Sequence, residues 1–237
     1  MIFAALLAAA AVLETLSPKA RGGEKLRRWS ANLILAIVWV ALLRLLWPWI
    51  YPLVTEHTPK LIADSTWAFL PLALGVALSL LLLDLFQYWT HRLLHAVPWL
   101  WTLHRLHHSD SAVDASTGVR HHPLEPLANA PVQFALILVA GVPAEGAAAY
   151  ALVATVQSVV SHSNVCLPAM IDSFARRFIV TPDMHRIHHS VRPVDANTNF
   201  GMVFPYWDHI FGTYRPRAEG GEDEFQAGVE APLTAPA

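Results

Sequence analysis

Residues 103–110 read LHRLHHSD, and residues 184–191 read MHRIHHSV. Both stretches contain the string His-Arg-aliphatic-His-His-Ser, so three histidines recur at the same spacing in each. On a helix, positions i, i+3 and i+4 share one face, with Cβ atoms roughly 5–6 Å apart. Each stretch therefore predicts a short helix with three imidazoles on one face. The string is too short to be a repeated folding unit, so the repetition indicates shared chemistry.

The other histidines cluster in the same part of the chain. Eleven of the thirteen lie between residues 91 and 189, whereas His57 and His209 stand apart and are not expected to bind a metal. Besides the two repeated strings, this region contains an HxxxH pair at His91 and His95, the pair His121 and His122 in RHHPLE, and His162 in SHSN.

The chain has a single cysteine, Cys166, which excludes an intramolecular disulfide and a cysteine-rich zinc or iron–sulfur site. Any metal ion must therefore be held by imidazole, a ligand that suits zinc, copper, iron and nickel. One metal ion accepts roughly four to six ligands. The clustered histidines outnumber that, so the sequence predicts two metal ions.

The composition is that of a membrane protein. Of 237 residues, 54% are hydrophobic and only 14% are charged, whereas typical soluble domains carry about 25% charged residues. The formal net charge of −2 shows no basic excess of the kind that binds nucleic acid, so we expect no nucleic-acid partner.

The first apolar run, residues 1–16, is followed by a basic loop. The run is short for a membrane span, and we expect a marginal first membrane helix; a cleaved signal peptide and an in-plane segment remain alternatives. By the positive-inside rule, the loop lies in the cytoplasm. Its basic residues are Lys19, Arg21, Lys25, Arg27 and Arg28.

Three further apolar regions complete the expected topology. Residues 31–54 and 65–83 are each about as long as a span requires, and the second of them, which has no charged residue, is the clearest span. Residues 126–161 contain two apolar runs broken at GVPAEG, which predicts a helical hairpin. This arrangement places every histidine cluster on the cytoplasmic side of the membrane.

The predicted fold class is all-α: an integral membrane helical bundle of about four spanning helices or hairpin segments, under a cytoplasmic histidine-rich helical cap. The chain divides into three parts on this interpretation. They are N-terminal membrane helices in residues 1–80, a catalytic domain in residues 81–217 that includes the hairpin, and a disordered tail in residues 218–237.

The order and spacing of these motifs resemble the fatty acid hydroxylase/sterol desaturase superfamily of integral membrane di-iron oxygenases. The resemblance covers residues 80–215, and NFGMVFPYWDHIFGT, residues 199–213, is similar to the ending of that family. The motifs are HxxxH at 91–95, HxxHH at 104–108, HPLE at 122–125, HSN at 162–164 and HxxHH at 185–189.

The resemblance implies two iron ions, with zinc as a possible substituted metal, and O₂ as co-substrate. By motif match, the metal ligands are His91, His95, His104, His107, His108, His122, His162, His185, His188 and His189. We choose His122 over His121 because His122 directly precedes PLE. Five polar residues beside the motifs either orient imidazoles or serve as ordinary caps: Asp84, Tyr88, Glu125, Asn164 and Asp183.

The implied activity is hydroxylation or desaturation of a lipid, such as a sterol or fatty acyl chain, in the inner or cell membrane. No flavin, haem or iron–sulfur motif is visible, so electrons come from a separate reductase, ferredoxin or cytochrome. Three alternatives remain: a di-metal lipid hydrolase or ether-cleaving enzyme, a non-enzymatic metal-binding membrane protein, and a catalytically silent relative.

Overall fold

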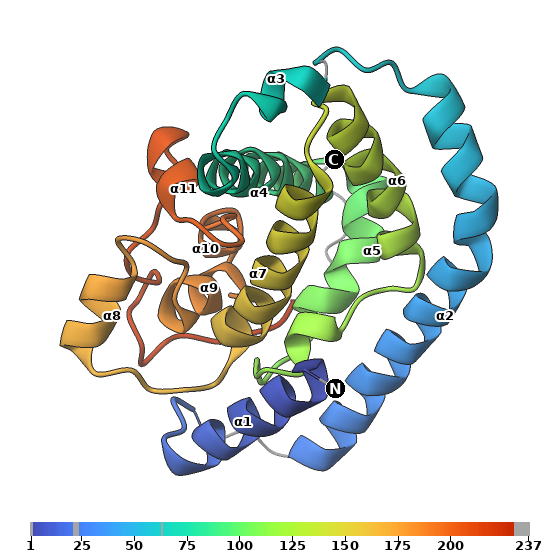
Figure 1. Ribbon diagram of the computed structural model, residues 1–237. Helices are drawn as coiled ribbons and strands as arrows, with labels where there is room; N and C mark the ends of the chain where they lie inside the picture. The colour runs from blue at the N-terminus through green and yellow to red at the C-terminus, as the bar shows by residue number, and fades with distance from the viewer. Residues whose placement is uncertain (1, 21–23, 63, 230–237) are drawn as a thin grey trace.

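The computed structural model of the protein describes residues 2–20, 24–62 and 64–229 (Figure 1). Within these ranges the chain is helical and has two isolated β-bridges but no strand, which confirms the expected helical class. The helices are α1 (Ile2–Leu16), α2 (Lys25–His57), α3 (Asp64–Ala68), α4 (Leu72–Ala96), α5 (Pro98–His108), a 3₁₀ turn (Thr117–Val119), α6 (Leu124–Val139), α7 (Ala144–His162), α8 (Ala169–Ala175), α9 (Pro182–His188), α10 (Pro193–Ala196) and α11 (Tyr206–Ile210).

Two of the described helices, α2 and α4, are long and apolar enough to cross a membrane. Helix α2 lies along one edge of the molecule (Figure 1). Its side chains Ile37, Leu45 and Trp49 leave two thirds or more of their surface exposed. A contiguous apolar face of this kind marks a surface that meets lipid or another apolar partner.

The expected span at 65–83 differs from the observed helix at both ends. The chain forms the short helix α3, breaks before Pro71, and starts α4 only at Leu72. Helix α4 then continues to Ala96, so the HRLLH motif belongs to the same apolar helix. It ends at Val97, whose backbone is extended, because a residue that precedes proline, here Pro98, is disfavoured in the helical conformation.

The expected hairpin forms from α6 and α7, with Gly141 at a positive φ of 58° in the connection. Its tip lies at the far end of α2, where the amides of Leu61 and Ile62 donate to the carbonyl of Val139 at 3.0 and 3.1 Å. Helix α7 packs against α4, and α6 packs against α2. The hairpin therefore runs beside the two candidate spans and returns to the end that carries the histidines.

Helix α1 lies at the histidine end of the bundle. Its residues Leu7 and Ala10 are buried in a cluster with Val159, near the end of α7. With 15 residues, α1 is shorter than the roughly 20 residues that a span requires. This placement across the end of the bundle fits the in-plane alternative better than a membrane crossing.

The tail beyond residue 217, expected to be disordered, is placed as far as residue 229. Ser190 and Ala227 form an antiparallel bridge, and the amide of Gly228 donates to the carbonyl of His189 at 3.0 Å. Residues 218–229 thus contact the second HxxHH motif through backbone hydrogen bonds. Residues 230–237 lie outside the described part of the chain.

Candidate metal centre

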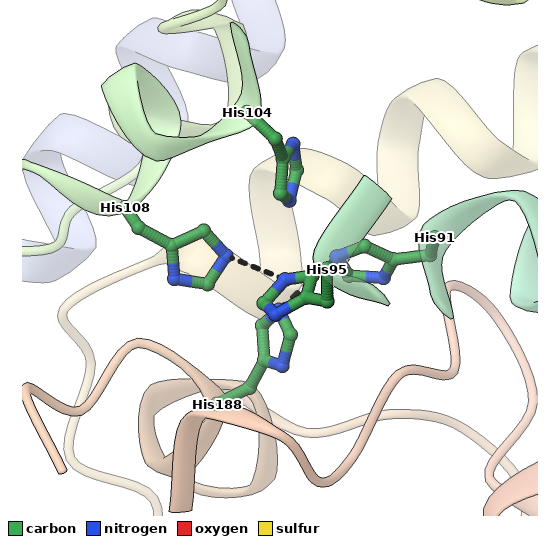
Figure 2. A group of neighbouring side chains, drawn as sticks. All are labelled: His91, His95, His104, His108 and His188. Carbon is green, nitrogen blue, oxygen red and sulfur yellow. Dashed lines mark hydrogen bonds between the residues drawn. The ribbon is translucent and has the colours of Figure 1, made fainter. Parts of the chain in front are cut away.

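The described structure brings nine histidines into two groups, in each of which the candidate ligand nitrogens all lie within 4.8 Å of one another. The first group is His91, His95, His104, His108 and His188, and the second is His107, His162, His185 and His189. The five rings of the first group come from three helices and face one another (Figure 2). All but His95 are buried.

Each HxxHH motif supplies both groups rather than one three-imidazole face. His107 belongs to the second group, although its neighbour His108 belongs to the first; His188 and His189 divide in the opposite order. Successive residues on a helix point about 100° apart. Two adjacent histidines at a helix end therefore diverge, and the motif can bridge two metal positions.

Helices α5 and α9 are short, and local sequence fixes where each begins. Pro98 and Pro182 occupy the first turns of their helices, where a missing N–H costs nothing and the fixed φ favours helix. The Thr181 side chain caps α9 by accepting from the amide of Met184 at 3.4 Å. These signals bring the histidines onto the last turn of each helix.

Four histidines donate their Nδ1–H to an oxygen that can only accept. His91 donates to the carbonyl of Phe200 at 2.9 Å, His188 to that of Thr198 at 2.8 Å, and His162 to that of Ser158 at 2.7 Å. His104 donates to a carboxylate oxygen of Glu125 at 3.1 Å. Partners of this kind fix the tautomer and orient metal-binding imidazoles.

The Nε2 atoms left by these bonds carry lone pairs, and those of His91 and His188 face one another. His188 Nε2 and His91 Nε2 are 3.0 Å apart, yet neither carries a proton in the neutral tautomer. His162 Nε2 lies 3.0 Å from His185 Nε2, but the Nδ1 of His185 has no partner in the described structure that fixes which nitrogen of that ring carries the proton. His104 Nε2 is buried without a partner in the described structure. Facing lone pairs repel unless a cation lies between them, so the donor set fits metal ions.

Burial keeps His185, His188 and His189 neutral, as a metal ligand must be. Burial first, and then neighbouring histidines, holds the pKa values of His185, His188 and His189 well below the usual value. Burial alone would raise the pKa of the Glu125 carboxyl, but His104 and His121 beside it hold that pKa below its usual range. Glu125 is therefore an anion that accepts hydrogen bonds from imidazole.

His121 and His122 have different surroundings in the structure. Those of His122, the ligand chosen from the sequence, do not include the histidine groups. His121 Nδ1 lies 3.1 Å from Glu125 Oε1, and its ring stacks on His107 with centroids 4.8 Å apart. His121, Glu125 and His104 form a third candidate group. His122 belongs to none of these groups, and its Nδ1 accepts from the amide of Leu124 at 3.2 Å.

The NFGMVFPYWDHIFGT segment supplies the carbonyl of Phe200 that orients His91, and Thr198, the residue just before the segment, supplies the carbonyl that orients His188. Asn199 adopts a positive φ of 52°, which asparagine tolerates better than most residues. Its side-chain amide donates to the carbonyl of Met184 at 3.0 Å. Asp208 accepts from the amides of Phe200 and Gly201 at 2.8 and 2.9 Å. A Cβ at Gly201 would lie 2.8 Å from that same carboxylate, so the close approach requires glycine.

Of the five polar residues flagged beside the motifs, Glu125 alone hydrogen-bonds an imidazole in the described structure. Asp84 accepts from backbone amides of the C-terminal segment, and Tyr88 contacts Thr213 at 2.8 Å. Asn164 accepts from the amide of Ala20, and Asp183 pairs with a lysine. These four fasten segments of the fold and do not orient the rings.

A cavity of about 740 Å³ opens beside both histidine groups. Side chains of α1, α2, α4, α6 and α7 contribute to its wall, and most of them are apolar. The wall also contains His91, His104, His107, His121, His162 and His185. The volume is in the usual range for a pocket that holds a small organic ligand.

Comparison with known proteins identifies relatives of this chain. Alkylglycerol monooxygenase of Danio rerio is 27% identical over 69% of this chain and 34% of its own length. Ornithine lipid hydroxylase OlsE of Rhizobium tropici is 29% identical over 61% of this chain and 43% of its own length. Sphinganine C4-monooxygenase 1 of Arabidopsis thaliana is 31% identical over 65% of this chain and 61% of its own length. The matched part of this chain thus covers from about a third to three fifths of these relatives.

No solved structure matches the chain closely enough to add to this comparison. The sequence profile of the fatty acid hydroxylase family, by contrast, matches residues 76–213. This range holds every histidine of the two groups and the segment whose carbonyls orient them, and it is more than half of the chain. The protein belongs to the fatty acid hydroxylase family.

Proposed function

We propose that the protein is a membrane-bound di-iron oxygenase that hydroxylates a lipid, with O₂ as co-substrate and electrons from a separate donor. The observation that carries the proposal is the position of two imidazole groups, buried except for His95, beside a mostly apolar cavity. An apolar cavity takes a hydrocarbon chain, and a pair of redox-active metals supplies the oxidation. The names of the three relatives, each a lipid hydroxylase or monooxygenase, support the same reaction class.

The two groups provide the ligands for the two proposed iron ions. The first ion takes nitrogens from α4, α5 and α9, and the second takes nitrogens from α5, α7 and α9 with His189. We add His121 beside the second group, because its ring stacks on His107 and is held by Glu125. We leave out His122. Bound iron supplies the oxidation of a C–H bond, and the protein's own residues orient the imidazoles and keep water from the cavity.

The exposed apolar face of α2 supports residence in a membrane, and the cavity wall supports entry of the lipid from there. Ala36, Trp39 and Leu43 of α2 line the cavity, while other residues of the same helix face outward. A lipid in the bilayer would thus have a short path to the metal centre. The basic residues at the start of α2 favour a cytoplasmic position for this end, where an electron donor would have access to it.

The direct test is lipid analysis by mass spectrometry in a host that lacks its own copy of this activity. Cells that express the wild-type chain should contain a lipid that has gained one oxygen atom. That lipid should be absent with His188→Ala, which removes a ligand from the first group. A product that has lost two hydrogens instead would make the enzyme a desaturase.

Metal analysis and oxygen uptake separate the oxygenase from the hydrolase alternative. The purified wild-type chain should hold close to two iron ions and consume O₂ in the presence of lipid and reductant. His188→Ala should hold less iron. A chain that holds redox-silent zinc and releases lipid fragments without O₂ uptake would overturn the oxygenase proposal in favour of metal-assisted hydrolysis.

A further inference from the structure

A line of polar residues crosses the otherwise apolar wall of the cavity. Glu125, Asn129 and Gln133 are spaced four apart on α6 and all line the cavity, as expected for residues on one helix face. Gln87 of α4 also lines it, and the side-chain amide of Gln133 donates a hydrogen bond to Gln87. Glu125 contacts the histidine groups, but the three amides do not.

These amides retain unused capacity for hydrogen bonds. The Asn129 side chain has no partner in the described structure, and the Nε1–H of Trp39, also in the wall, is buried without one. The Gln87–Gln133 bond uses only one donor and one acceptor of the pair. Polar groups that remain unpaired in an apolar cavity are unfavourable, so a purely hydrocarbon ligand leaves them unsatisfied.

The carboxamide side chains of Gln87, Asn129 and Gln133 favour a ligand group that is polar but uncharged. A carboxamide both donates and accepts, which suits a hydroxyl, an ester or an amide. Glu125 is the one charged residue among the described cavity residues, and His104 and His121 already pair with it. A charged headgroup at this depth would find no counter-ion.

Helix geometry gives the separation of the amide side chains from the histidine region along α4 and α6. Asn129 lies four residues after Glu125, and Gln87 lies four residues before His91. At about 1.5 Å per residue, each is about 6 Å along its helix from a residue of the histidine region. Gln87 therefore lies about one helical turn from His91, and Asn129 about one turn from Glu125, which contacts His104 and His121. Gln133 lies one turn further along α6 and reaches Gln87.

We propose that Asn129, with Gln87 and Gln133, binds an uncharged hydroxyl, ester or amide group of the lipid about one helical turn from the histidines. The inference rests on the proposed function, because it takes the occupant of the cavity to be the lipid substrate. It names the substrate class: a lipid whose oxidised carbon is a few bonds from such a group. The proposal excludes oxidation at a mid-chain or terminal carbon of a long hydrocarbon.

Binding of matched probes tests the site without any need for turnover. The iron-loaded full chain in detergent is mixed with hexadecanamide, hexadecanol or hexadecane, which share one chain length, and its thermal unfolding midpoint is measured. A bound ligand raises this midpoint. The two polar probes should raise it more than hexadecane in the wild type, and the stronger of them identifies the group that the site prefers.

The variants Asn129→Leu and Gln133→Met should erase this difference while stabilisation by hexadecane remains. Thr90→Val is the matched control. It removes a hydroxyl from α4 that already donates to the carbonyl of Phe86 and that lies outside the cavity wall. Equal stabilisation by all three probes in the wild type, or a difference that persists in both cavity variants, overturns the inference.

Product analysis provides the second readout. In the lipid assay, the new hydroxyl should lie within a few bonds of an ester, amide or hydroxyl. Asn129→Leu should lower kcat/KM by about tenfold, the value of one net hydrogen bond, and scatter the position of oxidation. An unchanged product pattern in both cavity variants overturns the inference and leaves the oxygenase intact. No oxidised lipid from the wild type overturns the proposed function alone, since probe binding is measured separately.

Discussion

At the scale of residues, His121 and His122 are neighbours in the sequence with different environments. His121 stacks on His107 and is held by Glu125, while His122 caps the start of α6 through its ring nitrogen. Both lie in the same six-residue motif, and the sequence favoured His122 because it directly precedes PLE. The contacts of the two rings at the start of α6 favour His121, the ligand that we propose.

Paired substitutions test this assignment. His121→Ala should lower iron content and product formation, because it removes a ring from the second group and a hydrogen-bond partner of Glu125. His122→Ala should keep both near the wild-type level. Iron per chain and oxidised lipid per chain are measured for each. The reverse order of effects would restore His122 as the ligand.

At the scale of elements, Asp84 connects α4 to the C-terminal segment that orients the histidines. Its carboxylate accepts from the amides of Val203 and Phe204 and from Nε1 of Trp207, each at 3.0 Å. All of these bonds join parts of the chain more than a hundred residues apart. The metal centre thus depends on a contact about two turns before His91, on the same helix.

Asp84→Ala should destabilise the fold because it leaves four donors without this acceptor, the fourth being the hydroxyl of Tyr150 at 3.4 Å. The expected loss is at least about 2 kcal/mol of unfolding free energy, since each buried unpaired donor is costly. The thermal unfolding midpoint and iron content should fall together. Asp223→Asn, at an exposed position, is the control and should leave both unchanged. A normal midpoint in Asp84→Ala would show that the segment docks without this contact.

At the scale of the whole molecule, the buried histidines make stability depend on pH. Burial, and then neighbouring histidines, lowers the pKa values of His107, His108, His185, His188 and His189 in the folded chain. Below the unfolded value of about 6.5 the unfolded chain binds more protons. Stability is therefore fully present above about pH 6.5 and is lost as the pH falls.

The chelator-treated chain should show this loss directly. Its thermal unfolding midpoint should fall steadily between about pH 7 and about pH 5, with each neutral histidine contributing up to about 1.4 kcal/mol per pH unit. His57→Gln, at an exposed position outside the groups, should show the same slope. A midpoint that is flat or rises on acidification contradicts neutral burial of the rings.

The single cysteine offers a test of membrane orientation. Cys166 is exposed, and its amide donates to the carbonyl of Ser17 at 2.9 Å, at the histidine end of the bundle. A membrane-impermeant maleimide should label it only after the cells are opened. In the background of Cys166→Ser, Glu56→Cys at the opposite end of α2 should label in intact cells. The opposite result would place the histidines outside.

The sequence by itself determined the helical class, the imidazole chemistry and the family resemblance. Each of these follows from local information: apolar runs of sufficient length, a lack of cysteine, and histidines at helical spacing. It also placed the NFGMVFPYWDHIFGT segment within the functional region, although without a role for it.

Only the tertiary structure decided which histidines share a group. Adjacent residues on a helix point about 100° apart, so the division of His107 from His108 depends on where α4, α7 and α9 lie around α5. The same holds for Phe200 and Thr198, whose carbonyls orient His91 and His188 across about a hundred and about ten residues of sequence. Backbone carbonyls have no sequence signature, because every residue carries one, and only the fold selects which of them meets a ring.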